Sequence, residues 1–140
     1  MFDTAPAHVR IETYVIKAPD GAELVGTLYA PARRPFAAVV LNGATGVPQG
    51  YYRHFARWLA EERGMACLTY DYRDTGKSLR GSMRASQADM LDWGLTDQLA
   101  ARRKLARLFP ETKLWIIGHS LGAMLTPITR ATPERSRWFG

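Results

Sequence analysis

The pentapeptide at residues 118–122, Gly-His-Ser-Leu-Gly, constrains the fold of this chain more than any other feature of its sequence. It follows the short apolar run 113–117, which is typical of a buried strand, and it precedes residues 123–126, which can begin a helix. A strand that turns directly into a helix forces its central residue, Ser120, into a strained backbone conformation that costs about 1–3 kcal/mol. Glycine is expected at both ends of the pentapeptide, because a Cβ atom there would clash with the adjoining strand and helix.

The spacing Gly-x-Ser-x-Gly in this context is the pattern of a nucleophile elbow. The turn would present the Ser120 hydroxyl above the end of the sheet, and the following helix would direct its N-terminal N–H groups and its dipole at the same point. The same pattern also occurs by chance, as a glycine-rich turn whose serine only caps the helix. The preceding strand and two upstream loops, described below, favour the nucleophile.

A serine nucleophile requires a base, usually histidine, and an acid that orients the base. Around elbows of this kind the acid and then the histidine follow the serine along the chain. The residues after Ser120 contain no histidine and no aspartate, and Glu134 is their one acidic side chain. The three histidines are His8, His54 and His119, and the His119 side chain is expected to point away from the Ser120 hydroxyl. The sequence therefore predicts a nucleophile without a complete triad.

The order of the predicted elements indicates an α/β fold in a single domain. A hairpin of two strands comes first, with a Pro-Asp-Gly turn between them, and strands and helices alternate after it. This order predicts a doubly wound, mostly parallel sheet with an antiparallel edge. The predicted strands cover 9–18, 23–30, 36–41, 65–70 and 113–117, and the predicted helices cover 51–63 and 85–109.

Helical periodicity assigns a buried face to each predicted helix. In 51–63 that face is expected to carry Phe55, Trp58 and Leu59. The helix 85–109 is expected to be interrupted at Gly94 and to bury a stripe of leucines. These are Leu91, Leu95, Leu99, Leu105 and Leu108.

Composition excludes several classes of function. The net charge of +6 comes from arginine clusters without interleaved aromatic residues or a recognition motif, so solvated faces are favoured over a nucleic-acid site. The single cysteine, Cys67, excludes an internal disulfide and a cysteine-based metal cluster, and no spacing suggests a metal, phosphate or dinucleotide site. No cofactor is expected. The chain has no long apolar run and its start lacks a signal-peptide pattern, so no membrane span and a cytoplasmic location are expected.

Three motifs together resemble the α/β-hydrolase superfamily: Asn-Gly-Ala-Thr-Gly at 42–46, Asp-Tyr-Arg-Asp-Thr-Gly-Lys-Ser at 71–78, and the elbow at 118–122. Within it, the chain is most similar to the serine aminopeptidase and monoacylglycerol-lipase-like group of bacterial predicted hydrolases. The resemblance covers about residues 10–126, the N-terminal half of such an enzyme. It implies a fold truncated after the nucleophile helix, with a core at about 9–126 and an irregular tail at 127–140.

Two residues depart from the pattern of that group. Asn42 stands where a histidine is usual, and Asp74 stands where a glycine is usual. Asp74 must then adopt a turn conformation that glycine adopts easily, and aspartate tolerates such conformations better than most residues.

The resemblance implies a serine hydrolase that cleaves an ester, thioester or amide of a small acyl substrate through an acyl-enzyme. Ser120 is the expected nucleophile, and the N–H groups of Leu121 and Ala44 are the expected oxyanion-hole donors, with Thr45 as an alternative to Ala44. Asp71 is expected to be structural, and Asp92 and Asp97 to be solvated or capping groups. The remaining residues that support the elbow and the loop are Gly118, His119, Gly122, Asn42, Gly43 and Thr45.

Two readings of this implication stay open. Without the histidine and the acid, the 140 residues alone are expected to be inactive, as the N-terminal part of the enzyme. Alternatively, the chain is a truncated non-catalytic remnant or a binding domain without turnover. In either case the strand 113–117 would form an apolar sheet edge, which predicts self-association or marginal stability.

Overall fold

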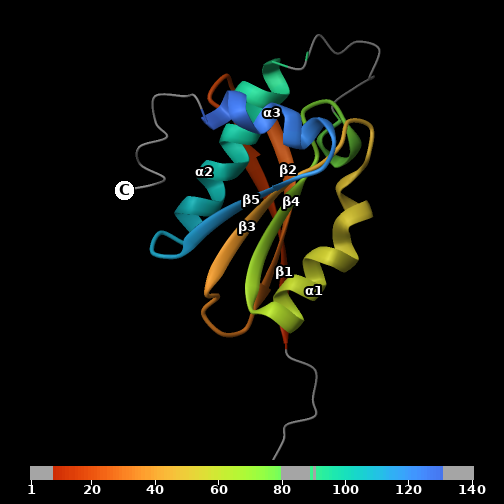
Figure 1. Ribbon diagram of the computed structural model, residues 1–140. Coiled ribbons are helices and arrows are strands. Elements are labelled where there is room, and N and C mark those ends of the chain that lie inside the picture. The colour runs from red at the N-terminus through yellow and green to blue at the C-terminus, as the bar shows by residue number, and fades with distance from the viewer. Residues whose placement is uncertain (1–7, 80–88, 90, 131–140) are drawn as a thin grey trace, which may run out of the picture.

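The computed structural model describes residues 8–79, 89 and 91–130, and these form a single mixed sheet covered by helices (Figure 1). The spatial order of the strands is β1-β2-β4-β3-β5. β1 pairs antiparallel with β2 and β2 antiparallel with β4, whereas β3 pairs parallel with both β4 and β5. The predicted hairpin and the three parallel strands are therefore confirmed. The strands are β1 (Val9–Lys17), β2 (Glu23–Pro31), β3 (Ala37–Asn42), β4 (Met65–Tyr70) and β5 (Lys113–Gly118).

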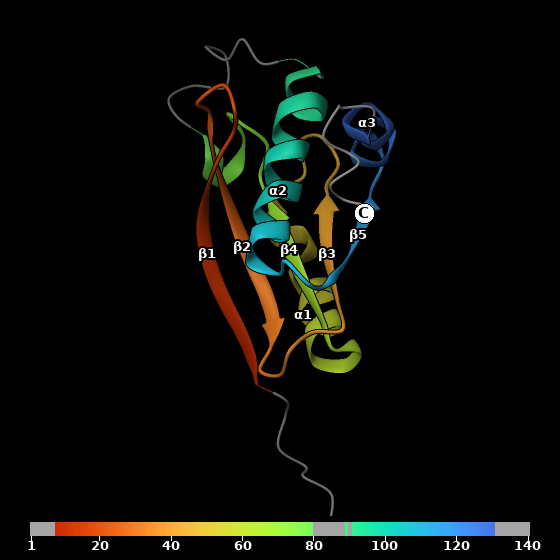
Figure 2. The ribbon, with the colours of Figure 1, turned by 90° about the vertical axis from the view of Figure 1, so that its left-hand side faces the viewer.

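Helices cover the two faces of this sheet, with α2 in front of it and α1 behind it in the view of Figure 2. The alternation of side chains along β3 explains both layers, because Val40 packs in the core cluster that contains α2, and Val39 in the cluster that contains α1. The helical segments are η1 (Gln49–Tyr52), α1 (Arg53–Arg63), η2 (Gly76–Ser78), the π-helical η4 (Asp92–Asp97), α2 (Gln98–Leu108) and α3 (Leu121–Arg130).

The buried face of α1 differs from the one predicted. Leu59 is buried, as expected, but the side chains of Phe55 and Trp58 are 41% and 46% exposed. Ala56 and Ala60 share the buried face with Leu59, and all three pack in one core cluster with Val39 and Cys67 of the sheet. The two aromatic rings instead stack on each other outside the core, with their centroids 6.0 Å apart.

The helix before β5 is predicted in part. Leu99 and Leu105 are buried, whereas Leu91 and Leu95 are 55% and 42% exposed, contrary to the expected stripe. The physical reason is the π-helical segment η4, which contains Gly94 and Leu95 and shifts the helical phase between Leu91 and Leu99. Residues 85–88 and 90 of the predicted helix lie outside the described residues.

The helix that follows the elbow extends past its expected end. α3 continues through Pro127 to Arg130, whereas the irregular segment was expected to begin at 127. The rest of that segment, 131–140, lies outside the described residues.

Candidate active site

Ser120 lies between the end of β5 and the start of α3, with a φ of 55° and an exposed side chain. The expected strained turn is therefore present. A Cβ atom at Gly118 would lie 2.4 Å from Ala123 Cα in α3, and one at Gly122 would lie 2.0 Å from the carbonyl oxygen of Asn42 in β3. Both distances are far below van der Waals contact, which explains why glycine occupies both positions.

Three tyrosine hydroxyls hold three successive residues at the end of β3 and the start of the loop that follows it. Two of the tyrosines come from the end of β4 and its following loop, and the third comes from η1. The loop is thus fixed through one side chain, one carbonyl and one amide, all of them buried. The three hydrogen bonds run from Tyr70 O–H to Asn42 Oδ1 (2.6 Å), from Tyr72 O–H to the Gly43 carbonyl (2.9 Å) and from Ala44 N–H to Tyr52 Oη (2.9 Å).

His119 joins this loop to the elbow. Its backbone N–H donates to the Asn42 carbonyl at 2.9 Å, and its Nδ1 lies 2.8 Å from the hydroxyl of Tyr52. The imidazole also stacks on the ring of Tyr51, with the planes 8° apart. The His119 side chain is therefore engaged with the two tyrosines at the start of the α1 region.

The expected oxyanion-hole donors differ in their surroundings. Leu121 is the first residue of α3, where N–H groups have no carbonyl partner within the helix. The Ala44 N–H, in contrast, already donates to Tyr52. Thr45, the alternative donor, is exposed, and Asn42 is buried and donates from Nδ2 to Thr126 Oγ1 of α3 at 3.2 Å.

The loop after β4 is organised around the buried carboxylate of Asp71. It accepts hydrogen bonds from the backbone N–H and the side-chain amide of Gln49 and from the Lys77 N–H, which fits the structural role expected for it. Gly76 has a φ of 47°, and a Cβ atom there would lie 2.6 Å from the Asp71 carboxylate. Asp74 has a φ of 60°, which confirms that it adopts the turn conformation in which glycine is usual.

Asp97 is fully buried, so the expectation of a solvated or capping group is wrong for this residue. Its carboxylate accepts hydrogen bonds from the backbone and the guanidinium of Arg73, which also pairs with Asp20 in the β1–β2 turn. Burial raises the pKa of Asp97, against the hydrogen bonds from Arg73 that lower it. Burial works to lower the pKa of Arg73, but the hydrogen bonds with Asp20 and Asp97 outweigh it and raise that pKa.

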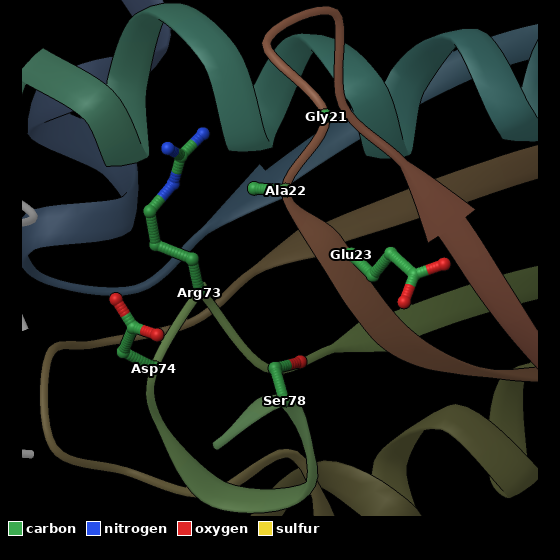
Figure 3. Close-up of a pocket in the computed structure, with 6 residues that line it drawn as sticks. All are labelled: Gly21, Ala22, Glu23, Arg73, Asp74 and Ser78. Carbon is green, nitrogen blue, oxygen red and sulfur yellow. The ribbon is translucent and has the colours of Figure 1, made fainter. Parts of the chain in front are cut away.

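The sequence alone does not reveal this group of three charges, because Asp20, Arg73 and Asp97 come from three separate segments. Figure 3 shows the Arg73 side chain reaching from its loop toward the helix above it. Arg73 lines an open pocket of about 290 Å³ that lies at the β1–β2 turn rather than at the elbow. The pocket is lined by Gly21, Ala22, Glu23, Arg73, Asp74 and Ser78.

Other chemical features of the described residues are few. In these ranges no three histidine, cysteine, aspartate or glutamate side chains come together in a way that could hold a metal ion. Over the same part of the chain, no helix has the length and apolar character needed to cross a bilayer. Cys67 is buried in the sheet, as expected, and burial raises the pKa of its thiol to about 12.

Solved structures of esterases share this arrangement of strands and helices. A thermostable carboxyl esterase from Bacillus coagulans superposes with a TM-score of 0.75 at 19% identity, over 89% of this chain and 41% of that one. An esterase from Pyrococcus furiosus gives 0.72 at 21% identity, over 90% and 48%. Brefeldin A esterase, a bacterial homologue of human hormone-sensitive lipase, gives 0.71 at 21% identity, over 99% and 39%.

The chain has the α/β-hydrolase fold. At these identities the likeness is one of fold, and the chain spans less than half the length of these three structures. No protein-family model and no curated protein matches the sequence. Within the α/β-hydrolase fold, the turn at Ser120 is the feature of this chain with the clearest chemical meaning.

Proposed function

We propose that this chain is the nucleophile-bearing part of a serine hydrolase that cleaves an ester, thioester or amide of a small acyl substrate. One observation carries the proposal: Ser120 is exposed at a left-handed φ between β5 and α3, in a fold shared with esterases and a lipase. A turn strained by about 1–3 kcal/mol persists only where the surrounding structure enforces it, and such turns cluster at functional sites. The motifs at 42–46 and 71–78 support the narrower resemblance to the serine aminopeptidase and monoacylglycerol-lipase-like group.

In this proposal Ser120 Oγ attacks the acyl carbon and forms an acyl-enzyme, which water then hydrolyses. The N–H of Leu121 and a second N–H, from Ala44 or Thr45, stabilise the oxyanion, and loss of one such donor costs roughly 2.7–4 kcal/mol. No histidine follows Ser120 in the sequence. The base and the acid are therefore supplied from outside these 140 residues.

A second candidate is a binding domain without turnover. The hydrogen bond from Ala44 N–H to Tyr52 favours it, because an amide that is already paired does not stabilise an oxyanion. The two candidates differ in whether Ser120 becomes nucleophilic when the rest of the catalytic machinery is present.

A fluorophosphonate probe followed by peptide mass spectrometry separates them. The purified chain should react slowly at Ser120 and show negligible esterase turnover, because loss of the triad histidine costs on the order of a millionfold in turnover. In an extract of the organism that encodes the chain, Ser120 should react rapidly, and Ser120→Ala should abolish the labelled peptide. Equally slow labelling in both samples would favour the binding domain. Rapid labelling of the purified chain would place the base among its own histidines.

A further inference from the structure

The hydroxyl of Tyr52 stands at the junction of the two parts of the proposed oxyanion hole. It accepts the Ala44 N–H at 2.9 Å, and it lies 2.8 Å from Nδ1 of His119, the residue before Ser120. When that nitrogen is unprotonated, the phenol accepts one hydrogen bond and donates the other, so both of its roles are used. Tyr52 is 8% exposed, so water competes poorly for either contact.

This contact blocks the site where an oxyanion would bind Ala44. An oxyanion-hole donor must lie 2.7–3.1 Å from the oxyanion, and the Tyr52 oxygen already lies within that range of the Ala44 nitrogen. Two oxygen atoms cannot occupy that position together. Ala44 can therefore serve as a donor only after the tyrosine hydroxyl has moved away.

Packing keeps the tyrosine in this position. Its ring lies so close to Gly43 that a Cβ atom there would be 2.9 Å from Tyr52 Cε2, and the ring of Tyr51 packs edge-on at 5.2 Å between centroids. The ring of His119 lies edge-on at 5.8 Å. The hydroxyl is thus held by its surroundings as well as by its two hydrogen bonds.

We propose that Tyr52 is a positioning residue that acts as a latch on the oxyanion hole, holding the Ala44 N–H until a charged oxygen displaces it. The inference rests on the proposed function of Ser120. A neutral carbonyl competes poorly with the phenol, whereas an oxyanion forms a charge-assisted hydrogen bond that is roughly twice as strong. The Tyr52 hydroxyl therefore leaves Ala44 in the transition state rather than in the complex with bound substrate. The free energy needed to break its hydrogen bond with Ala44 slows the reaction.

The test compares Tyr52→Phe with the matched control Tyr51→Phe in the full 140-residue chain. Tyr51 is exposed and stacks on His119 through its ring, which phenylalanine retains. Removing the Tyr52 hydroxyl should raise the rate of fluorophosphonate labelling at Ser120 about 2- to 13-fold, the factor that corresponds to one neutral hydrogen bond. Tyr51→Phe should leave that rate unchanged. A purely structural role for Tyr52 predicts the opposite sign, because a disordered loop would slow the labelling.

Amide hydrogen exchange supplies a readout that needs no reaction at Ser120. Tyr52→Phe should accelerate exchange of the Ala44 amide, while the His119 amide, which donates to the Asn42 carbonyl, should stay protected. Unchanged exchange at Ala44, or a labelling rate that falls in Tyr52→Phe, overturns the latch. An absence of label at Ser120 in every sample, cell extract included, contradicts the proposed function instead, and the Ala44 amide then still decides whether the latch contact exists.

Discussion

The close approach of α3 to β3 at Gly122 predicts that glycine-to-alanine substitutions around the elbow destabilise the fold to different degrees. In Gly122→Ala the new Cβ atom would lie 2.0 Å from the Asn42 carbonyl oxygen and 2.6 Å from that of Gly43. Ordinary contact begins near 3.4 Å, so β3 and α3 must separate by at least about 1 Å. Because β3 is buried on both faces, it has little room to move. Overpacking costs about 1–3 kcal/mol, and we expect the upper end of that range here.

That cost is a large share of the stability of a small domain, which is about 5–15 kcal/mol. It corresponds to a fall in melting temperature of about 10 °C for a chain of this size. Gly50→Ala is the matched control, because its Cβ atom meets nothing within 4 Å in the described part of the chain. We expect that variant to remain within about 0.5 kcal/mol of the parent.

Two further glycine-to-alanine variants test the same argument at other distances. Gly118→Ala places its Cβ atom 2.4 Å from Ala123 Cα and should resemble Gly122→Ala. Gly43→Ala meets the edge of the Tyr52 ring at 2.9 Å and should cost less, because a ring edge can shift. Thermal and urea unfolding followed by circular dichroism would measure all four. If Gly122→Ala melted within 2 °C of Gly50→Ala, the packing argument at the elbow would be refuted.

Three further predictions concern stability and assembly. The folded chain holds the Cys67 proton more tightly than the unfolded chain, because its pKa is raised from 9.0 to about 12, so stability should fall as pH rises through that window. Urea melts should show a loss on the order of 1 kcal/mol from this thiol at pH 10, and Cys67→Ala should remove that part of the pH dependence. Asp97→Asn removes the buried carboxylate that faces the partly exposed Arg73 guanidinium, leaves Asp20 as its ion-pair partner, and should cost about 2–3 kcal/mol in denaturant unfolding, whereas Asp92→Asn should cost much less. Light scattering should find the chain self-associated, or thermal melting should find it marginally stable, because Trp115 of the edge strand β5 is 51% exposed; a monomer that melts well above about 65 °C would contradict this.

Features set by local chemistry could be predicted from the sequence. The apolar run that became β3 has the length and continuity of a buried strand, and the glycine spacing together with the preceding apolar run marked the turn at Ser120. The turn between the first two strands followed from its Pro-Asp-Gly sequence, and Gly21 there has a φ of 92°. In each case neighbouring residues determine the conformation, so the pattern along the chain is sufficient.

Features set by distant contacts could not be predicted in this way. Periodicity placed Phe55 inward, but the alanines on the next face of α1 determine which side lies on the sheet. Asp97 has the appearance of a helix-surface carboxylate until the fold brings Arg73 against it. The contacts of Tyr70 and Tyr72 could have been anticipated in part. The two residues are two positions apart at the end of a strand, where such side chains lie on the same face.

An amide rather than an imidazole at position 42 makes the hydrogen bonds of this residue indifferent to acidity. The Asn42 side chain accepts from Tyr70 and donates to Thr126 at the same time, and it does so without an ionisable group. Burial holds the pKa of Tyr70 well above its ordinary value and raises that of Tyr72 to about 12, so both phenols remain neutral donors. A histidine at this position would exchange donor for acceptor roles between about pH 5 and 8. The two hydrogen bonds of Asn42 should therefore keep one geometry across that whole interval.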